Sequence, residues 1–106
     1  MNKIQKDEIM LRLSTLRTQN NLSARKLSER IGKNYGYIHK LEHSQDFLPT
    51  IDTLYDILEV CQSTPAEFFY YDMKQYKADM EIIELLSSVD SETKQAIITM
   101  LKKVKK

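Results

Sequence analysis

The chain has 106 residues, of which 42% are hydrophobic and 29% are charged, and its formal net charge is +1. This length and composition exclude a large multidomain enzyme and a disordered chain, and they predict one compact domain with at most a short appendage. The lone Cys61 cannot form an internal disulfide, and together with two histidines it cannot complete a cysteine-rich zinc site. Because no apolar run approaches about 20 residues and the first ten residues lack an apolar core, we expect a cytoplasmic protein without a membrane span.

Charge is distributed unevenly along the sequence. From Arg12 to Lys40 there are seven basic residues and one acidic residue, Glu29, which gives a block charge of +6. From Leu41 to Asp72 there are seven acidic residues and no Lys or Arg, a block charge of −7. A fold with this distribution can present a basic face to a polyanion, so nucleic acid is the leading candidate partner. Scattered surface charge explains the same counts about as well, and the motifs must decide between the two.

The first two predicted helices fill roughly residues 6 to 31. Only two Gly and two Pro occur and no segment alternates like a strand, so we expect an all-α chain. The first helix, about Lys6 to Asn20, ends where Asn20 and Asn21 tolerate the left-handed conformation. The second follows Ser23, a good N-cap, and ends at Gly32, which reaches positive φ without steric cost. The apolar stripes of the two helices comprise Ile9, Leu13 and Leu16, and then Ala24, Leu27 and Ile31.

The third predicted helix runs from Tyr35 to about His43, with Asn34 as its N-cap. Its only apolar aliphatic positions are Ile38 and Leu41, three residues apart, so most of its surface faces outward. Such a thin apolar seam indicates a presented surface rather than a helix that serves only for packing.

Two further helices complete the first part of the chain. Thr50 is the predicted cap of a fourth helix, and Thr64 with Pro65 and Glu67 predicts the start of a fifth. The side chains expected in the core from these helices are Ile51, Leu54, Ile57, Leu58, Cys61, Phe68 and Phe69. We therefore place a five-helix domain at residues 1–71.

Residues 72–106 are predicted to form a C-terminal two-helix hairpin. One helix spans about residues 73 to 89, and a second begins after Asp90 or Ser91. The pair has more apolar surface than it can bury alone, so a second copy is the natural cover and a homodimer is expected. The alternative is a hairpin that folds back on its own domain and leaves a monomer. The expected dimerisation residues are Met80, Ile83, Leu86, Ile97, Met100 and Leu101.

The segment from Ser23 to Glu42 has the layout of a helix-turn-helix. Small Ser28 allows the two helices to cross closely, and Gly32 forms the corner between them. A helix held outward in this way fits the major groove of B-DNA, which is about 12 Å wide. The residues expected to join the two helices are Leu27, Ile31, Ile38 and Leu41.

Residues 13 to 69 resemble the phage Cro and repressor type of helix-turn-helix domain, often called the XRE family. The similarity lies in Leu16-Arg17, Asn21–Ser23, Ile31-Gly32, Tyr37–Glu42, Pro49–Ile51 and Thr64–Phe69, taken in order and spacing together. The resemblance implies a five-helix, lambda-repressor-like domain that binds double-stranded DNA. It also implies a structural ion pair between Arg17 and Glu42.

The resemblance further implies which side chains approach DNA. Bases would be approached from residues 34 to 36 and from Lys40, while the start of the second helix would meet a phosphate. Ala24 stands where the family commonly has Gln, and Gly36 has no side chain to contact a base, so no operator sequence follows. The expected DNA-facing residues are Ser23, Ala24, Arg25, Lys33, Asn34, Tyr35, Gly36, Tyr37, His39 and Lys40.

Catalytic and metal-binding readings are weak. His39 and His43 have the spacing of a shared metal site, but Glu42 is the only further ligand in evidence, so a phosphate-facing or solvent-exposed pair is favoured. Cys61 continues the apolar stripe of the fourth helix, which favours a buried small hydrophobe over a nucleophile. Because no Gly-rich phosphate loop or catalytic Ser pattern occurs, we expect neither an enzyme nor a cofactor.

Two function classes remain. The preferred one is a sequence-specific transcriptional repressor at the nucleoid, bound to a two-fold operator as a homodimer. The other is an antitoxin-like or protein-interaction module whose C-terminal hairpin captures a partner protein, with DNA binding secondary.

Overall fold

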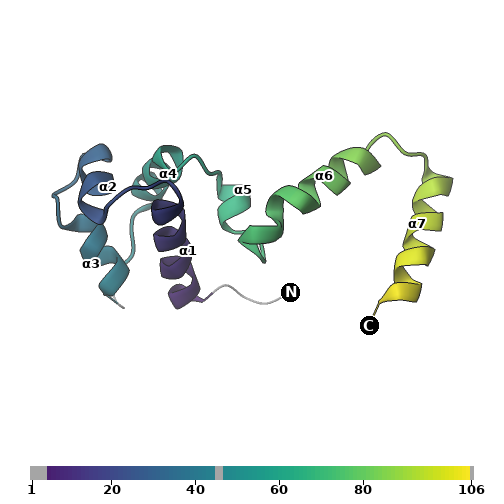
Figure 1. Cartoon of the computed structure of the whole chain (residues 1–106), viewed down its shortest axis with the longest axis horizontal. Coiled ribbons are helices and arrows are strands. Elements are labelled where there is room, and N and C mark those ends of the chain that lie inside the picture. Colours follow the sequence, from purple (N-terminus) through teal and green to yellow (C-terminus); the bar gives the residue numbers. More distant parts are fainter. Residues whose placement is uncertain (1–4, 45–46, 106) are drawn as a thin grey trace. The chain divides into compact units, whose positions relative to one another are not determined.

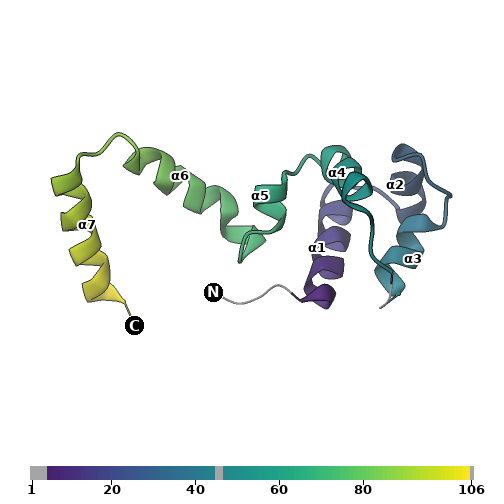
Figure 2. The same ribbon diagram turned by 180° about the vertical axis from the view of Figure 1, so that it is seen from behind.

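The computed structural model describes residues 5–44 and 47–105, and all regular structure in these ranges is helical (Figures 1 and 2). The predicted all-α fold class is thereby confirmed. The described chain divides into two compact units, one that ends at Met73 and one that begins at Lys74. The helices are α1 (Lys6–Gln19), α2 (Ala24–Arg30), α3 (Tyr37–His43), α4 (Ile51–Val60), α5 (Pro65–Phe68), the 3-10 segment η1 (Met73–Gln75), α6 (Tyr76–Leu86) and α7 (Ser91–Val104).

The hydrophobic core of the first unit is built from all five of its α-helices and the residue after α4. Helix α3 lies against α1 and α2, α2 against α4, and α4 against α5. Phe68 is fully buried, at 0% exposure, although α5 has only four residues. The buried apolar side chains are Leu13, Leu16, Leu27, Ile38, Leu41, Ile57, Leu58, Cys61 and Phe68.

The helices begin and end at residues suited to these places. Asn21 has a φ of 56° after α1, and Gly32 has a φ of 73° after α2, so both adopt the predicted left-handed conformation. The hydrogen bonds from Thr93 lower the pKa of the N-cap Asp90. The structure confirms four of the predicted N-caps, and in each the side chain accepts a hydrogen bond from the backbone N–H three residues later. These caps are Ser23, Thr50, Thr64 and Asp90.

Two of the predicted core side chains are exposed. Ile51 is 68% exposed because it is the first residue of α4, whose buried face passes through Thr53 and Ile57 instead. Phe69 is 45% exposed because α5 ends at Phe68 and adjacent helical positions point about 100° apart. The Phe69 ring lies edge-on against Phe68, with 4.9 Å between the ring centroids.

Arg12, which we counted with the basic surface, is an internal residue that is 5% exposed. Its Nη1 donates to the carbonyls of Phe68, at 2.6 Å, and Tyr70, and its Nη2 donates to the carbonyl of Tyr71 at 3.0 Å. Its Nε also contacts Glu8 at 3.2 Å. Arg12 therefore joins α1 to the segment that follows α5, and its charge is not presented to a ligand.

The second unit departs from the predicted helix boundaries. The expected single helix over residues 73 to 89 is divided into η1 and α6, and α6 ends at Leu86, with a turn before Ser91. Neither α6 nor α7 contains a buried residue. The apolar faces predicted for this part of the chain are therefore present, with Met80, Leu86 and Ile97 half-buried and most of the other large apolar side chains exposed.

Candidate nucleic-acid interface

Ser28 joins the two helices of the helix-turn-helix. Its side chain, at 0% exposure, donates from Oγ to the carbonyl of Ala24 at 2.8 Å. The same Oγ accepts a hydrogen bond from the backbone N–H of Ile38 at 3.0 Å, at the start of α3. The first turn of a helix leaves backbone N–H groups without intrahelical partners, so this contact caps α3 from the neighbouring helix. The sequence suggested only a small spacer at this position.

We expect Ser28→Ala to lower the free energy of unfolding by about 1 to 2 kcal/mol, because it leaves the buried N–H of Ile38 without a partner. Urea denaturation followed by circular dichroism measures this change. Ser14→Ala, a change of the same type on a half-buried residue of α1, serves as the control. Equal stability of the Ser28 and Ser14 variants would contradict a capping role for Ser28.

Asn34 does not cap α3, contrary to the prediction, and α3 begins two residues later than expected, at Tyr37. The Oδ1 atom of Asn34 instead accepts a hydrogen bond from the backbone N–H of Gly36 at 2.9 Å, which closes a turn. Tyr35 and Gly36 therefore lie in the turn that leads into α3. Because its oxygen already accepts this hydrogen bond, the amide NH₂ of Asn34 is the polar group that the side chain presents as a donor.

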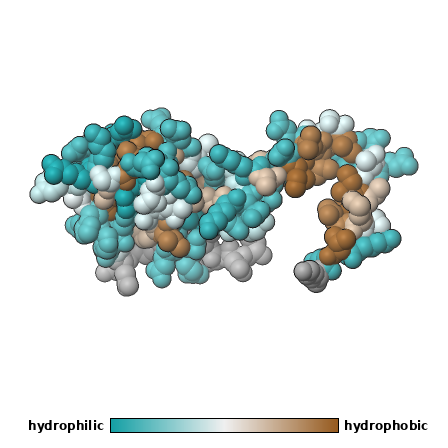
Figure 3. Space-filling model, in the orientation of Figure 1, coloured by the Kyte–Doolittle hydropathy of each residue, from teal (hydrophilic) through white to brown (hydrophobic). Residues whose placement is uncertain are grey.

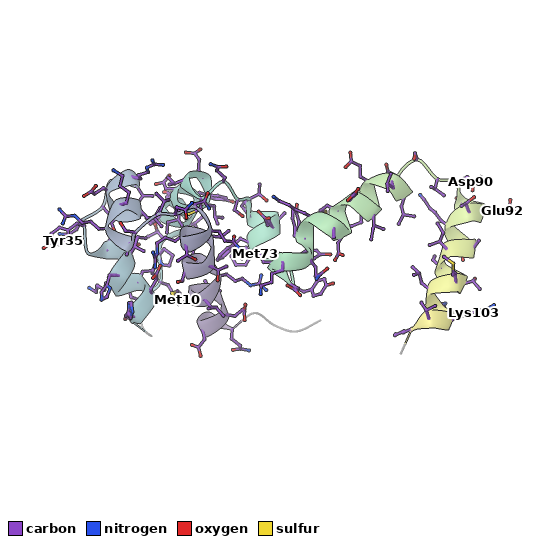
Figure 4. All side chains as sticks on the ribbon, viewed as in Figure 1. Met10, Tyr35, Met73, Asp90, Glu92 and Lys103 are labelled. Carbon is purple, nitrogen blue, oxygen red and sulfur yellow. The ribbon has the colours of Figure 1, made fainter. Side chains whose placement is uncertain are left out.

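The exposed side chains of this region place cations beside aromatic rings. Tyr35 is 65% exposed and projects outward from the turn between α2 and α3 (Figure 4). The Arg25 guanidinium lies 5.2 Å from the centroid of the Tyr35 ring, and Lys40 Nζ lies 5.1 Å from that of Phe47. Such cation–π contacts restrict long side chains before a ligand arrives. Phe47 lies in the segment between α3 and α4, and no pattern in the sequence indicated its role.

Tyr37 belongs to the packing of the domain more than to its surface. Its ring meets Phe47 edge-on, with 5.3 Å between centroids, and Lys33 Nζ lies 5.5 Å from the Tyr37 centroid. Burial raises the pKa of Tyr37, and a hydrogen bond with Thr53 opposes this shift. The phenol therefore stays protonated at neutral pH, and the ring supports the turn that holds Tyr35.

The remaining expected DNA-facing residues differ in exposure. Ala24 is half-buried and packs against the core, and Gly36 is also half-buried. The Ser23 hydroxyl accepts a hydrogen bond from the N–H of Lys26 at 3.0 Å, so its oxygen is engaged in capping α2. The exposed members of the expected set are Ser23, Arg25, Lys33, Asn34, Tyr35, His39 and Lys40.

His39 and His43 are stacked on each other at the exposed surface of α3. Their ring centroids are 4.2 Å apart, and His43 Nδ1 lies 2.8 Å from the carbonyl oxygen of His39. Within residues 5–44 and 47–105, no group of three or more His, Cys, Asp or Glu residues is placed to hold a metal ion. Burial raises the pKa of the Cys61 thiol, which is 2% exposed.

Arg17 and Glu42 are joined by two hydrogen bonds, from Nε at 2.7 Å and from Nη2 at 2.9 Å. The Nη1 atom of Arg17 also donates to the carbonyl of Leu22 at 2.9 Å. The hydrogen bond to Glu42 raises the pKa of Arg17, and burial opposes this shift. This bidentate contact fixes the C-terminal half of α3 to α1, as Ser28 fixes its beginning to α2.

The surface of α2, the turn and α3 is basic once the internal arginines are removed from the count. The exposed charged residues of residues 24–40 are five cations and the single carboxylate of Glu29, a net charge of +4. Helix α4 has three exposed carboxylates and no basic residue. A polyanion is therefore attracted to one face of the unit and repelled by α4. The five cations are Arg25, Lys26, Arg30, Lys33 and Lys40.

Comparison with known proteins gives one family. A family model described as helix-turn-helix matches residues 13–68, which is more than half of the chain. No curated protein and no solved structure matches the chain. None of the helices that the structure describes is long and apolar enough to cross a membrane.

Proposed function

Because the chain belongs to the XRE-type helix-turn-helix family of DNA-binding transcription regulators, we propose that it is a repressor that binds a two-fold operator as a homodimer. The observation that supports this function best is the fixed position of α3. Ser28 and Arg17 hold its two ends, while its exposed side chains belong to a surface with a net charge of +4. A rigid, basic, outward-facing helix is suited to the major groove.

The geometry suggests a division of roles among the exposed side chains. Tyr35 and Lys40 approach base edges, since both point outward next to the start and the middle of α3. Arg25, Lys33 and His39 contact phosphates and fix the orientation of the domain on the duplex. Asn34 contributes an amide donor. The acidic side chains of α4 exclude docking through the opposite face.

Repression follows from occupancy of a promoter at the nucleoid, which excludes polymerase. The two half-sites require two copies, and the second unit supplies the contact between them through Met80, Ile83, Leu86, Ile97, Met100 and Leu101. The half-site spacing then reports the geometry of the dimer, because HTH dimers bind half-sites one helical turn, about 34 to 36 Å, or multiples of it apart.

The test begins with selection of bound sites from a random DNA library by the full chain. On the selected site, Lys40→Ala is expected to weaken binding about tenfold to a hundredfold. If Lys40 contacts a phosphate, the salt dependence of binding also falls by about one charge, and if it contacts guanine, one base position becomes degenerate. Lys77→Ala on α6 removes the same charge from the other unit and should leave the affinity for an isolated half-site unchanged.

If the selected DNA shows no common sequence, or if the Lys40 and Lys77 variants bind with equal affinity, the proposed docking is contradicted. A reporter gene placed behind the selected site tests the repressor role, which requires lower expression when the protein is present. The second candidate function, an antitoxin-like module, draws on the uncovered apolar faces of α6 and α7. It predicts a pure chain that stays monomeric until a different protein binds.

A further inference from the structure

The second unit exposes an unusual amount of apolar surface for its size. Figure 3 shows hydrophobic residues gathered along α6 and along α7. The large apolar side chains, each between 41% and 68% exposed, are Ile82, Ile83, Leu85, Ile98, Met100, Leu101 and Val104.

The two helices have opposite charge. Helix α6 contains three carboxylates and one lysine, a net charge of −2. Helix α7 contains three lysines and one carboxylate, a net charge of +2. At 100° per residue, Glu81 and Glu84 lie at the two edges of the apolar face of α6, and Lys102 and Lys103 lie at the two edges of that of α7. The edges of a helix interface are where charged side chains select a partner.

A hairpin that closes on itself does not match these charges. The turn between α6 and α7 is centred between Ser87 and Asp90. Antiparallel closure about this turn would bring Lys102 and Lys103 near residues 72 to 79, where Lys74 and Lys77 lie between Asp72 and Asp79 and the net charge is zero. The acidic Glu81 and Glu84 would instead lie opposite residues 96 and 93, away from both lysines. The basic end of α7 therefore needs an acidic helix other than the nearest part of its own α6.

We infer that α6 of one copy packs against α7 of a second copy, and that the reciprocal pair completes a two-fold dimer. This inference rests on the homodimer of the proposed function and names the helices that form it. In a two-fold interface the α6–α7 contact occurs twice, so one symmetric arrangement covers both apolar faces and pairs both sets of charges. Pairing of α6 with α6, or of α7 with α7, would join two helices of the same net charge.

Charge reversal on each helix tests the pairing. The E81K/E84K chain changes α6 from −2 to +2, and the K102E/K103E chain changes α7 from +2 to −2. Each variant alone should self-associate on the order of a hundredfold more weakly, as measured by sedimentation or light scattering at low salt. The D52K/D56K chain, which places the +4 change of E81K/E84K on α4 instead, should remain dimeric like the parent.

Mixing the two reversed chains separates pairing between copies from pairing within one chain. An equimolar mixture should form a heterodimer, because each reversed helix meets its complement in the other chain. The chain that contains all four substitutions should recover its own dimer. Parent-like dimers of either reversed chain would overturn the pairing, and so would a mixture that stays monomeric or a parent chain that is a monomer.

Binding to a single half-site keeps this result distinct from the DNA-binding function. The reversed chains should bind an isolated half-site with parental affinity and lose only the additional affinity for the two-fold site. If the parent chain does not bind an isolated half-site, the proposed function is refuted, whatever the oligomeric state.

Discussion

Replacement of Arg12 by Met is expected to lower the free energy of unfolding by about 3 to 5 kcal/mol, the cost typical of removing one partner from a buried charged network. Met preserves much of the aliphatic volume, so the loss reports the guanidinium rather than the packing. The change leaves the carbonyls of Phe68, Tyr70 and Tyr71 without the donors that they have in the structure. Because small domains have stabilities of only about 5 to 15 kcal/mol, the variant should approach unfolding at 37 °C.

Urea denaturation of the full chain measures this loss of stability, and two further variants serve as comparisons. Arg12→Lys retains the charge but not the planar fork of donors, so it should recover only part of the stability. Arg25→Met removes an exposed arginine from α2 and should change stability by less than about 0.5 kcal/mol. A loss of under 1 kcal/mol for Arg12→Met would show that the segment after α5 is held by other contacts.

Glu42→Ala should cost about 3 kcal/mol or more, because it leaves the Arg17 guanidinium largely buried without its carboxylate. The Arg17 side chain is 16% exposed and that of Glu42 is 8% exposed. The variant should also bind DNA more weakly, since the C-terminal half of α3 loses its attachment to α1. A double-mutant cycle with Arg17→Met measures the coupling energy between the two residues. We expect this coupling energy to exceed about 1 kcal/mol, as is usual for residues in one hydrogen-bond network.

The chain contains its own matched control for this experiment. Arg25 and Glu29 form an ion pair at 3.3 Å, but their side chains are 72% and 49% exposed. Glu29→Ala should change stability by no more than about 0.5 kcal/mol, and added salt should remove the effect. If the two glutamate variants are equally stable, burial does not decide the strength of these pairs.

The helical fold was predictable because its evidence is local. Ser23, Thr50, Thr64 and Asp90 cap helices where the sequence places them, since a capping side chain bonds only three residues ahead. Gly32 turns the chain as expected, because glycine adopts a positive φ, here 73°, without steric cost. The apolar seam of α3, Ile38 and Leu41, is buried as its spacing predicted.

Features that depend on distant partners were not predictable in the same way. Arg12 was counted with the basic surface because a sequence shows a charge but not the carbonyls that approach it from 56 to 59 residues away. Ser28 was identified as small, yet its bond to Ile38 depends on how closely α2 and α3 cross. Phe69 and Ile51 are apolar residues near helix ends, where periodicity does not determine which direction is covered.

The position of Arg12 has a consequence for how this protein can change over evolutionary time. Every apolar side chain that is buried in the described chain belongs to residues 13–68, and the carbonyls bound by Arg12 end at Tyr71. A recombination joint placed after Met73, the last residue of the first unit, would therefore leave the helix-turn-helix unit intact. A lineage can exchange the C-terminal segment without rebuilding the helix-turn-helix unit.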